Sequence, residues 1–124
     1  MKAYLLDTHI LLWWLGDDKK LTKRIKDLID DSDNDIVVSA VSIWEIVLKK
    51  SANKLEAPDN LQDILHENEI RLLSMKPEHA FYFGKLPRLH PDPFDRLLIA
   101  QCVVEDLVFV TADKIIPQYK VKCF

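Results

Sequence analysis

Short apolar runs alternate along the chain with stretches in which apolar residues recur every three or four positions. The runs predict buried strands, and the spaced residues predict helices with one apolar face. Strands are predicted at 2–6, 36–38, 71–74 and 107–110. Helices are predicted at 8–14, 21–30, 40–50, from 58, at 77–83 and at 93–104, with a short helix after 113 and a candidate edge strand at 119–123.

The order of these elements predicts the fold class. Strands that alternate with helices form parallel sheets, and a continuous apolar run such as 107–110 suits a strand buried on both faces. We therefore expect a three-layer α/β/α fold around a mostly parallel sheet of four to five strands. A chain of 124 residues without repeats or linker-like segments fits one domain, which we expect to span residues 1–124.

Bulk composition narrows the class of protein. No apolar run approaches the roughly 18 residues of a membrane span, so we expect no membrane partner. Asp7 interrupts the apolar N-terminal segment, which does not resemble a signal peptide, and we expect a cytoplasmic location. Cys102 and Cys123 are too few for a disulfide framework. The net charge of -3 argues against a protein that binds duplex DNA through phosphate contacts alone.

Four carboxylates stand in or beside segments that otherwise look buried. Asp7 and Glu45 are each the one residue charged at neutral pH within 3–15 and 36–48. Asp113 follows the last apolar run, and Asp95 lies in the first turn of the helix that begins at 93. A lone ionised group in apolar surroundings is costly unless something pairs with it. A divalent cation shared by all four groups is the simplest partner.

Topology supports this cation hypothesis. Asp7 and Asp113 both follow strands, and ligands of open α/β sheets bind beyond the carboxyl ends of the strands. Two carboxylates ~4 Å apart repel by about 4 kcal/mol at an effective dielectric constant of ~20. A converging cluster would therefore take up protons or bind a cation. Oxygen ligands favour Mg²⁺ or Mn²⁺, whereas no histidine pair has the spacing of a zinc site.

Each acid also has a simpler interpretation, which the sequence leaves open. Asp7 and Asp113 are in position to cap the helices that follow them, and Asp95 is favoured by its helix dipole. Glu45 could form an ion pair with Arg96 or with a lysine.

Four short motifs in the chain resemble those of PIN domains. They are L-L-D-T-H at 5–9, W-E-I at 44–46, D-P-F-D-R-L-L-I-A-Q at 92–101 and T-A-D at 111–113. With the order of strands and helices, the resemblance to a PIN-like fold covers essentially the whole chain, and the ten-residue block is its most specific part. The chain departs from the family pattern at Asn53, where glycine is frequent, and at Ile116, where an aromatic residue is common.

The resemblance to VapC-like toxins of this family implies a Mg²⁺-dependent endoribonuclease, for which Mn²⁺ is a possible substitute. It also implies a small antitoxin as partner and a homodimer as assembly. By position, the acidic residues of the family fall on the four carboxylates that the apolar context had selected: Asp7, Glu45, Asp95 and Asp113.

These residues suggest a mechanism in which metal-activated water hydrolyses an RNA phosphodiester. Asp7 and Asp95 are the first choices for direct metal contact. Thr8, Ser39 and Thr111 are candidates for hydrogen bonds that orient the metal-binding groups. Arg96 is a candidate phosphate contact, with a salt bridge as its alternative role.

Other interpretations compete with a toxin. A phosphatase with Asp7 as nucleophile usually needs a second acid two residues later, where this chain has His9. A non-catalytic interaction module would not need four acids, and an RNA-processing PIN nuclease would need no antitoxin. Trp13 and Trp14 make the first helix apolar on more than one face, which fits either a core position or a surface for the antitoxin or a second copy.

Overall fold

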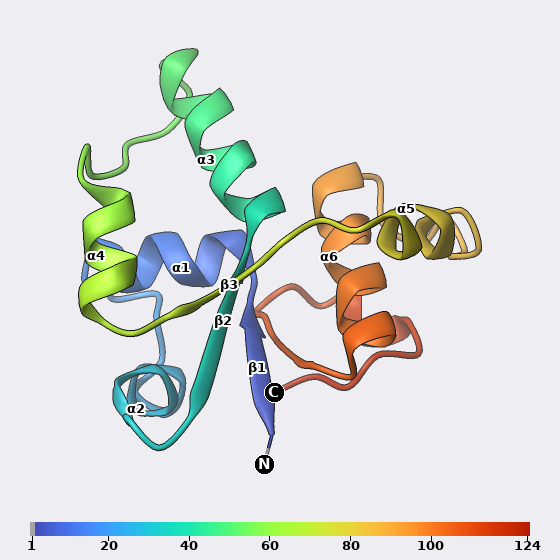
Figure 1. Ribbon diagram of the computed structural model, residues 1–124, viewed down its shortest axis with the longest axis horizontal. Coiled ribbons are helices and arrows are strands. Elements are labelled where there is room, and N and C mark those ends of the chain that lie inside the picture. The colour runs from blue at the N-terminus through green and yellow to red at the C-terminus, as the bar shows by residue number, and fades with distance from the viewer. Residues whose placement is uncertain (1) are drawn as a thin grey trace.

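The computed structural model describes residues 2–124 and places a four-stranded sheet between helices (Figure 1). The strands are Ala3–Leu6 (β1), Asp35–Ser39 (β2), Arg71–Leu73 (β3) and Val108–Val110 (β4). Their order across the sheet is β3-β2-β1-β4, and every neighbouring pair is parallel. The predicted α/β class with a parallel sheet is therefore confirmed.

The helices lie on the predicted segments, with ends that differ by a few residues. They are Thr8–Leu15 (α1), Lys23–Asp30 (α2), Ala40–Ser51 (α3), Leu61–Glu67 (α4), Pro77–Phe83 (α5) and Pro93–Glu105 (α6), followed by the 3-10 turn Ile116–Gln118 (η1). The Ser39 hydroxyl caps α3 by accepting a hydrogen bond from the Val41 N–H. Among the described residues, no helix has the length and apolar character needed to cross a membrane.

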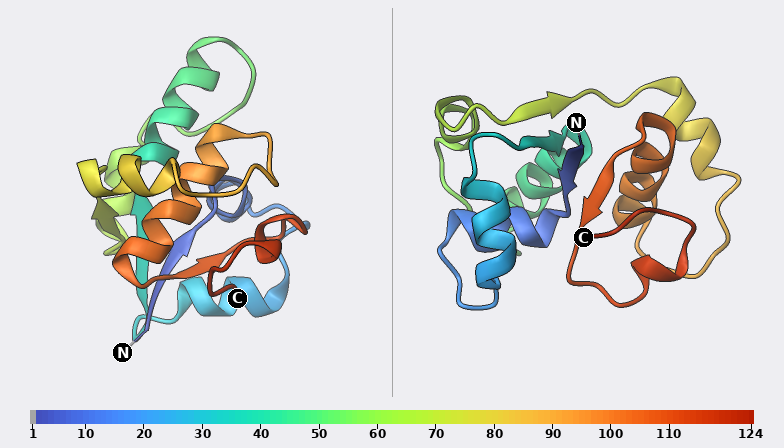
Figure 2. Two further views of the ribbon diagram at one scale, coloured as in Figure 1. Left: turned by 90° about the vertical axis from the view of Figure 1, so that its right-hand side faces the viewer. Right: turned by 90° about the horizontal axis from the view of Figure 1, so that it is seen from below.

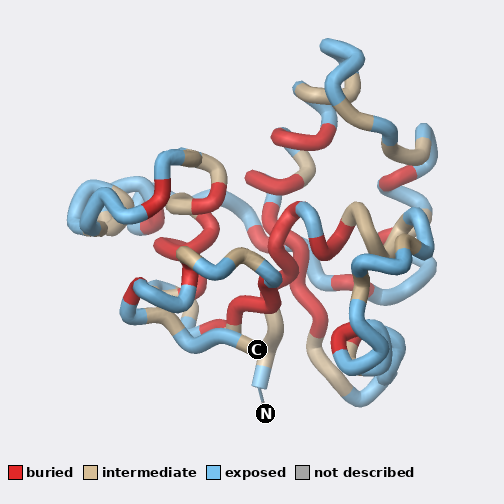
Figure 3. Tube along the Cα trace, turned by 180° about the vertical axis from the view of Figure 1, so that it is seen from behind, coloured by how far each residue is buried: buried red, intermediate tan, exposed pale blue. Residues whose placement is uncertain are grey.

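Alternation along the strands divides the core into two layers. Leu6 packs with Ile10 of α1 and Ile25 of α2 on one face of the sheet, and Leu5 packs with Leu98 of α6 on the other. Figure 2 shows α1 and α2 on one side of the strands and α6 on the opposite side. The buried stretches of the chain follow the central strands and the helix faces against them (Figure 3). This arrangement is the expected three-layer architecture.

The predicted edge strand at 119–123 is reduced to a single bridge. Only Cys123 pairs with Phe109 of β4, in parallel, while the Phe109 N–H donates to the Lys122 carbonyl at 2.8 Å. The 3-10 turn η1 runs up to Gln118, and the next residue, Tyr119, packs its side chain into the core and not along β4. The sheet therefore has four strands in the described part of the chain.

The strand order places a topological switch point beside β1. From β1 the chain moves outward through β2 to β3, and it then returns to form β4 on the other side of β1. Ligands of open α/β sheets bind at such a reversal, beyond the carboxyl ends of the two strands that flank it. Asp7 and Asp113 follow these two strands.

Candidate metal centre

The two acids that follow strands are brought together by β1 and β4. The Asp7 N–H donates to the Val110 carbonyl at 2.9 Å, so the parallel pairing of the strands continues to the first acid. Thr111 donates its hydroxyl to Asp7 Oδ2 at 2.7 Å and accepts the Asp113 N–H at 3.0 Å. One threonine therefore fixes the side chain of Asp7 and the backbone of Asp113.

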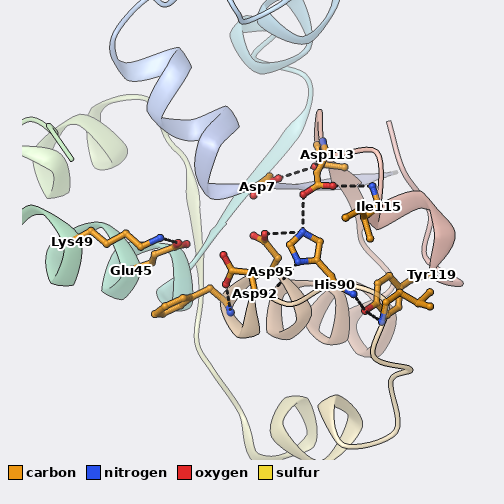
Figure 4. Close-up of polar contacts among 12 residues, drawn as sticks. Asp7, Glu45, Lys49, His90, Asp92, Asp95, Asp113, Ile115 and Tyr119 are labelled. Atoms are coloured by element: carbon orange, nitrogen blue, oxygen red, sulfur yellow. Dashed lines mark hydrogen bonds and ion pairs between the residues drawn. The ribbon is translucent and has the colours of Figure 1, made fainter. Parts of the chain in front are cut away.

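The other two acids come from helices on the same side of the molecule. Asp95 lies in the first turn of α6 and Glu45 in the middle of α3, and both are buried. Figure 4 shows Asp7, Asp95 and Asp113 around one histidine, with Glu45 farther away beside Lys49. Glu45 Oε2 lies 2.6 Å from Lys49 Nζ, which is the lysine pair considered as its alternative role.

The acids nevertheless form one electrostatic cluster. Burial, together with the charges of Asp7 and Asp92, raises the pKa of Asp95 from 3.8 to about 7, and Glu45 adds to the rise. Burial also raises the pKa of Asp7, although the hydrogen bond from Thr111 opposes the rise. These shifts mean that the negative charges at the end of the sheet lack sufficient compensation from protein groups.

Asp113 differs from Asp7 and Asp95 because hydrogen bonds stabilise its anion. Burial opposes its ionisation, but hydrogen bonds from His90 and from the Ile115 N–H outweigh burial and lower the pKa of Asp113. Its Oδ1 atom accepts the Ile115 N–H at 2.8 Å, while Oδ2 faces the histidine. Asp113 thus stabilises the turn at Ile115 through Oδ1 and contacts His90 of the cluster through Oδ2.

Two buried carboxylate oxygens in the described part of the chain have no hydrogen-bond partner. They are Asp7 Oδ1 and Glu45 Oε1. Asp7 occupies the N-cap position of α1, yet its side chain makes no capping hydrogen bond. Leaving a buried acceptor unpaired destabilises the folded state by about 1–3 kcal/mol, and by more when the acceptor is charged. Such an atom therefore indicates a missing partner. The residues fit a divalent cation, because both of these unpartnered acceptors are carboxylate oxygens, the ligands that hard divalent cations prefer.

His90 belongs to the cluster, although its sequence position did not single it out. His90 Nε2 lies 2.7 Å from Asp113 Oδ2 and 3.3 Å from Asp95 Oδ2. His90 has no histidine at the spacing of a zinc site, because its partners are acids. The available signal was its place in the loop H-P-D-P that leads directly into α6. Asp92, whose side chain caps α6 by accepting the Phe94 N–H at 2.8 Å, also adds its charge to the cluster.

The four candidate supporting residues have different contacts. Thr111 binds Asp7, as described above, whereas Thr8 donates to Ser42 at 2.9 Å. Ser39 donates to Gln101 while it caps α3. Arg96 stacks on the Phe83 ring, with its guanidinium carbon 4.4 Å from the ring centroid, and it forms no salt bridge in the described part of the chain. Their roles in metal or phosphate binding remain predictions.

Comparison with known proteins gives consistent matches. Residues 4–122 match the PIN domain family. Ribonuclease VapC22 of Mycobacterium tuberculosis is 26% identical over 117 residues, which cover 92% of this chain and 89% of that protein. A solved structure of VapBC2 from Rickettsia felis bound to a promoter DNA fragment has a TM-score of 0.74 at 19% identity, with 98% of this chain and 97% of that chain covered.

A second solved structure, DNA-bound VapBC from Salmonella typhimurium, has a TM-score of 0.73 at 15% identity, with 100% of this chain and 98% of that chain covered. At such low identity these structures establish the shared fold. The family match extends over nearly the whole chain and includes β1, β4 and all four acids. The chain therefore belongs to the PIN-domain family.

Proposed function

We propose that this protein is a metal-dependent endoribonuclease and the VapC-like toxin of a toxin–antitoxin pair, with residues 1–124 as one catalytic domain. The observation that carries the proposal is the pair of unpartnered buried oxygens, Asp7 Oδ1 at the switch point and Glu45 Oε1 on α3, within the charge cluster that raises the pKa of Asp95. A relative named as a ribonuclease, similar along most of its length, supports RNA as the substrate.

The metal ligands in this proposal are Asp7 and Asp95, with Glu45 and Asp113 binding directly or through water. Mg²⁺ is the expected ion and Mn²⁺ its substitute, because the free donors are hard oxygen atoms. When bound, such an ion lowers the pKa of a water molecule and stabilises negative charge on the leaving oxygen.

The chain's own groups prepare this chemistry. Thr111 binds Asp7 Oδ2 and so leaves Oδ1 directed to a ligand. Lys49 binds Glu45 Oε2 in the same way and leaves Oε1 without a partner. The Lys49 side chain is about one-third exposed, at 35%, so its ammonium group is also available to a phosphate at the edge of the site. These hydrogen bonds fix one oxygen of each acid before substrate arrives.

Substrate affinity would depend on few phosphate contacts, since the net charge is -3. Arg96 remains a candidate, but in this structure its guanidinium is stacked on Phe83 and its Nη2 atom lies 3.4 Å from the Leu86 carbonyl. RNA shape and exposed loops would then supply most of the selectivity.

The antitoxin and the homodimer both require an apolar surface. Trp13 and Trp14 pack against the core, and the Trp14 indole donates to Asp30 at 3.0 Å, so α1 exposes less apolar area than its sequence suggests. Trp44 is 57% exposed and borders an apolar groove between α3, α5 and α6. The groove is lined by Trp44, Met75, Ala80, Phe83, Pro93, Phe94 and Leu97. This groove is the surface that we assign to protein partners.

The direct test replaces Asp7 with Asn and measures cleavage of RNA in Mg²⁺. Asp63→Asn, on the exposed side of α4, is the matched control. We expect cleavage to be lost in the first variant and retained in the second. Undiminished cleavage by pure, folded Asp7→Asn protein would contradict the proposal.

Two further assays separate the competing functions. Growth arrest on expression, relieved by Asp7→Asn and by a co-expressed antitoxin, distinguishes a toxin from an RNA-processing nuclease. Hydrolysis of a small phosphomonoester would favour the phosphatase interpretation, which the position of His9 after Asp7 does not support.

A further inference from the structure

The loop that carries His90 is held to the body of the protein by Tyr119. The Tyr119 hydroxyl accepts the Leu89 N–H at 3.0 Å and the His90 N–H at 2.8 Å. Tyr119 itself is buried against the layer that contains α6. The backbone at His90 is therefore fixed from a segment 29 residues farther along the chain.

A second contact fixes the hydrogen on the imidazole ring. The Asp92 N–H donates to His90 Nδ1 at 3.1 Å, so Nδ1 acts as an acceptor. A neutral imidazole with an accepting Nδ1 carries its hydrogen on Nε2. Asp92 has φ -80° and ψ 115°, an extended conformation that residues before proline favour, and Pro93 follows it. The extended backbone before Pro93 thus directs the Asp92 N–H to His90 Nδ1, and this contact selects the tautomer with hydrogen on Nε2.

The Nε2 hydrogen is then directed to Asp113, with Asp95 close by. His90 Nε2 lies 2.7 Å from Asp113 Oδ2, within hydrogen-bond distance, and 3.3 Å from Asp95 Oδ2. Figure 4 shows the Nε2 end of the ring facing both carboxylates. Because like charges repel, a donor that hydrogen-bonds to Asp113 lowers the cost of holding this carboxylate near Asp95.

We propose that His90 is a positioning residue that holds Asp113 next to Asp95, in their metal-binding arrangement, by donating its Nε2 hydrogen to Asp113, and that it is not a metal ligand. The inference rests on the proposed function only in that these acids bind a divalent cation. To bind the ion, Nε2 would have to lose its hydrogen. The hydrogen would move to Nδ1, where it would face the Asp92 N–H, and two donors would oppose each other.

The first test measures Mn²⁺ affinity by electron paramagnetic resonance without RNA. We expect His90→Ala to bind Mn²⁺ about 10–100-fold more weakly, the usual effect of losing a group that orients a ligand. His90→Gln keeps an amide N–H near the position of Nε2 and should restore most of the lost affinity. His79→Gln changes another buried histidine, which lies on α5 and contacts Glu105 of α6, and should leave the affinity unchanged.

These results have distinct meanings. Equal affinity of His90→Ala and the parent protein overturns the positioning role while the metal site stands. Failure of the parent protein to bind Mn²⁺ overturns the metal site and this role with it. Equal loss in His90→Ala and His90→Gln also overturns the role, because the hydrogen-bond donor would then be irrelevant.

The second test needs no enzymatic activity and no paramagnetic ion. Long-range ¹H–¹⁵N correlation spectra distinguish the two neutral tautomers of a histidine ring. We expect His90 to show the Nε2–H tautomer in metal-free protein and to keep it when Mg²⁺ is added. Loss of the Nε2 hydrogen on addition of Mg²⁺ would make His90 a ligand and overturn the proposal.

Discussion

Two buried histidines, His79 and His90, make the same kinds of contact. The polar groups around them differ in whether they have hydrogen-bond partners. His79 Nδ1 accepts the Lys76 N–H at 2.9 Å, and its Nε2 atom lies 2.8 Å from Glu105. His90 repeats this pattern with the Asp92 N–H and Asp113. In the described part of the chain the unpartnered buried side-chain atoms are Asp7 Oδ1, Glu45 Oε1 and Arg96 Nε. None of them belongs to the residues that hydrogen-bond to His79, whereas the two oxygens belong to the acids of the cluster that includes His90.

The region around His79 is a complete hydrogen-bond network. The Ser39 hydroxyl donates to the Gln101 carbonyl oxygen, and the Gln101 amide contacts His79 Nδ1 at 3.2 Å. A satisfied network of this kind stabilises one packing arrangement of α5, α6 and β2. The carboxylate cluster instead holds unrelieved repulsion that a cation can relieve. Buried carboxylate oxygens without a hydrogen-bond partner, more than buried charge itself, therefore indicate the candidate site.

The largest expected difference between the two regions is in RNA cleavage. Asp7→Asn should reduce cleavage in Mg²⁺ by at least about 100-fold, because the variant loses a proposed metal ligand. Glu105→Gln, which alters the partner of His79, should cleave RNA at nearly the parent rate. Initial rates on one labelled RNA at matched concentrations of folded protein provide the measurement. Similar losses in both variants would remove the distinction between the regions.

The second prediction concerns the stability of metal-free protein against pH. The pKa of Asp95 is raised from 3.8 to about 7 in the folded state, so folded protein binds this proton more tightly than unfolded protein does. The stabilisation is fully present below about pH 4 and is lost as the pH rises to about 7. At about 1.4 kcal/mol per pKa unit, the free energy of unfolding should fall by up to about 4 kcal/mol through this group.

Asp95→Asn isolates this contribution. Urea unfolding in EDTA at several pH values should give a flatter profile for the variant, and the variant should be more stable than the parent protein at pH 8. Asp113 acts in the opposite direction, because its lowered pKa gives stability that is lost only as the pH falls into the acid range. Parallel profiles for parent and variant would show that Asp95 does not titrate in this window.

The strands and the placement of two acids could be predicted from the sequence. The apolar runs predicted all four strands, because strands buried on both faces need continuous apolar residues. Asp7 and Asp113 could be placed at one edge because each follows a parallel strand. The Glu45–Lys49 pair was also within reach, since residues four apart meet on a helix.

Other features depended on contacts that a linear pattern does not contain. The position of His90 depends on Tyr119 and on the turn at Asp92, neither of which has a periodic signal. The prediction of an edge strand at 119–123 was wrong, because only Cys123 pairs with β4. Tyr119 instead packs into the core and binds the loop that carries His90. Tertiary contacts therefore decided the details of the site, while local patterns decided the fold.

The third prediction tests the satisfied network directly. Gln101→Ala removes the acceptor of the Ser39 hydroxyl and one contact of His79. Leaving buried polar groups unpaired should lower the free energy of unfolding by about 1–3 kcal/mol, with little change in Mn²⁺ affinity. Gln62→Ala on the exposed face of α4 is the matched control for urea unfolding. A large loss of Mn²⁺ affinity in Gln101→Ala would mean that the two regions are coupled.

The smallest expected effect comes from the residue that anchors the His90 loop. Tyr119→Phe removes the acceptor of the Leu89 and His90 N–H groups but keeps the aromatic ring in the core. We expect a loss of about 1 kcal/mol in the free energy of unfolding. Mn²⁺ affinity should fall less than in His90→Ala, because the imidazole donor is retained.

Tyr82→Phe on α5 is the control, since among the described residues the Tyr82 hydroxyl makes no hydrogen bond. Urea unfolding and Mn²⁺ titration of both variants give the two quantities side by side. An affinity loss in Tyr119→Phe as large as that in His90→Ala would mean that the fixed backbone, and not the imidazole hydrogen, positions the acids. An unchanged affinity would mean that the Asp92 N–H and the carboxylates hold the ring without Tyr119. Either result would identify which contact holds the His90 ring beside the carboxylates.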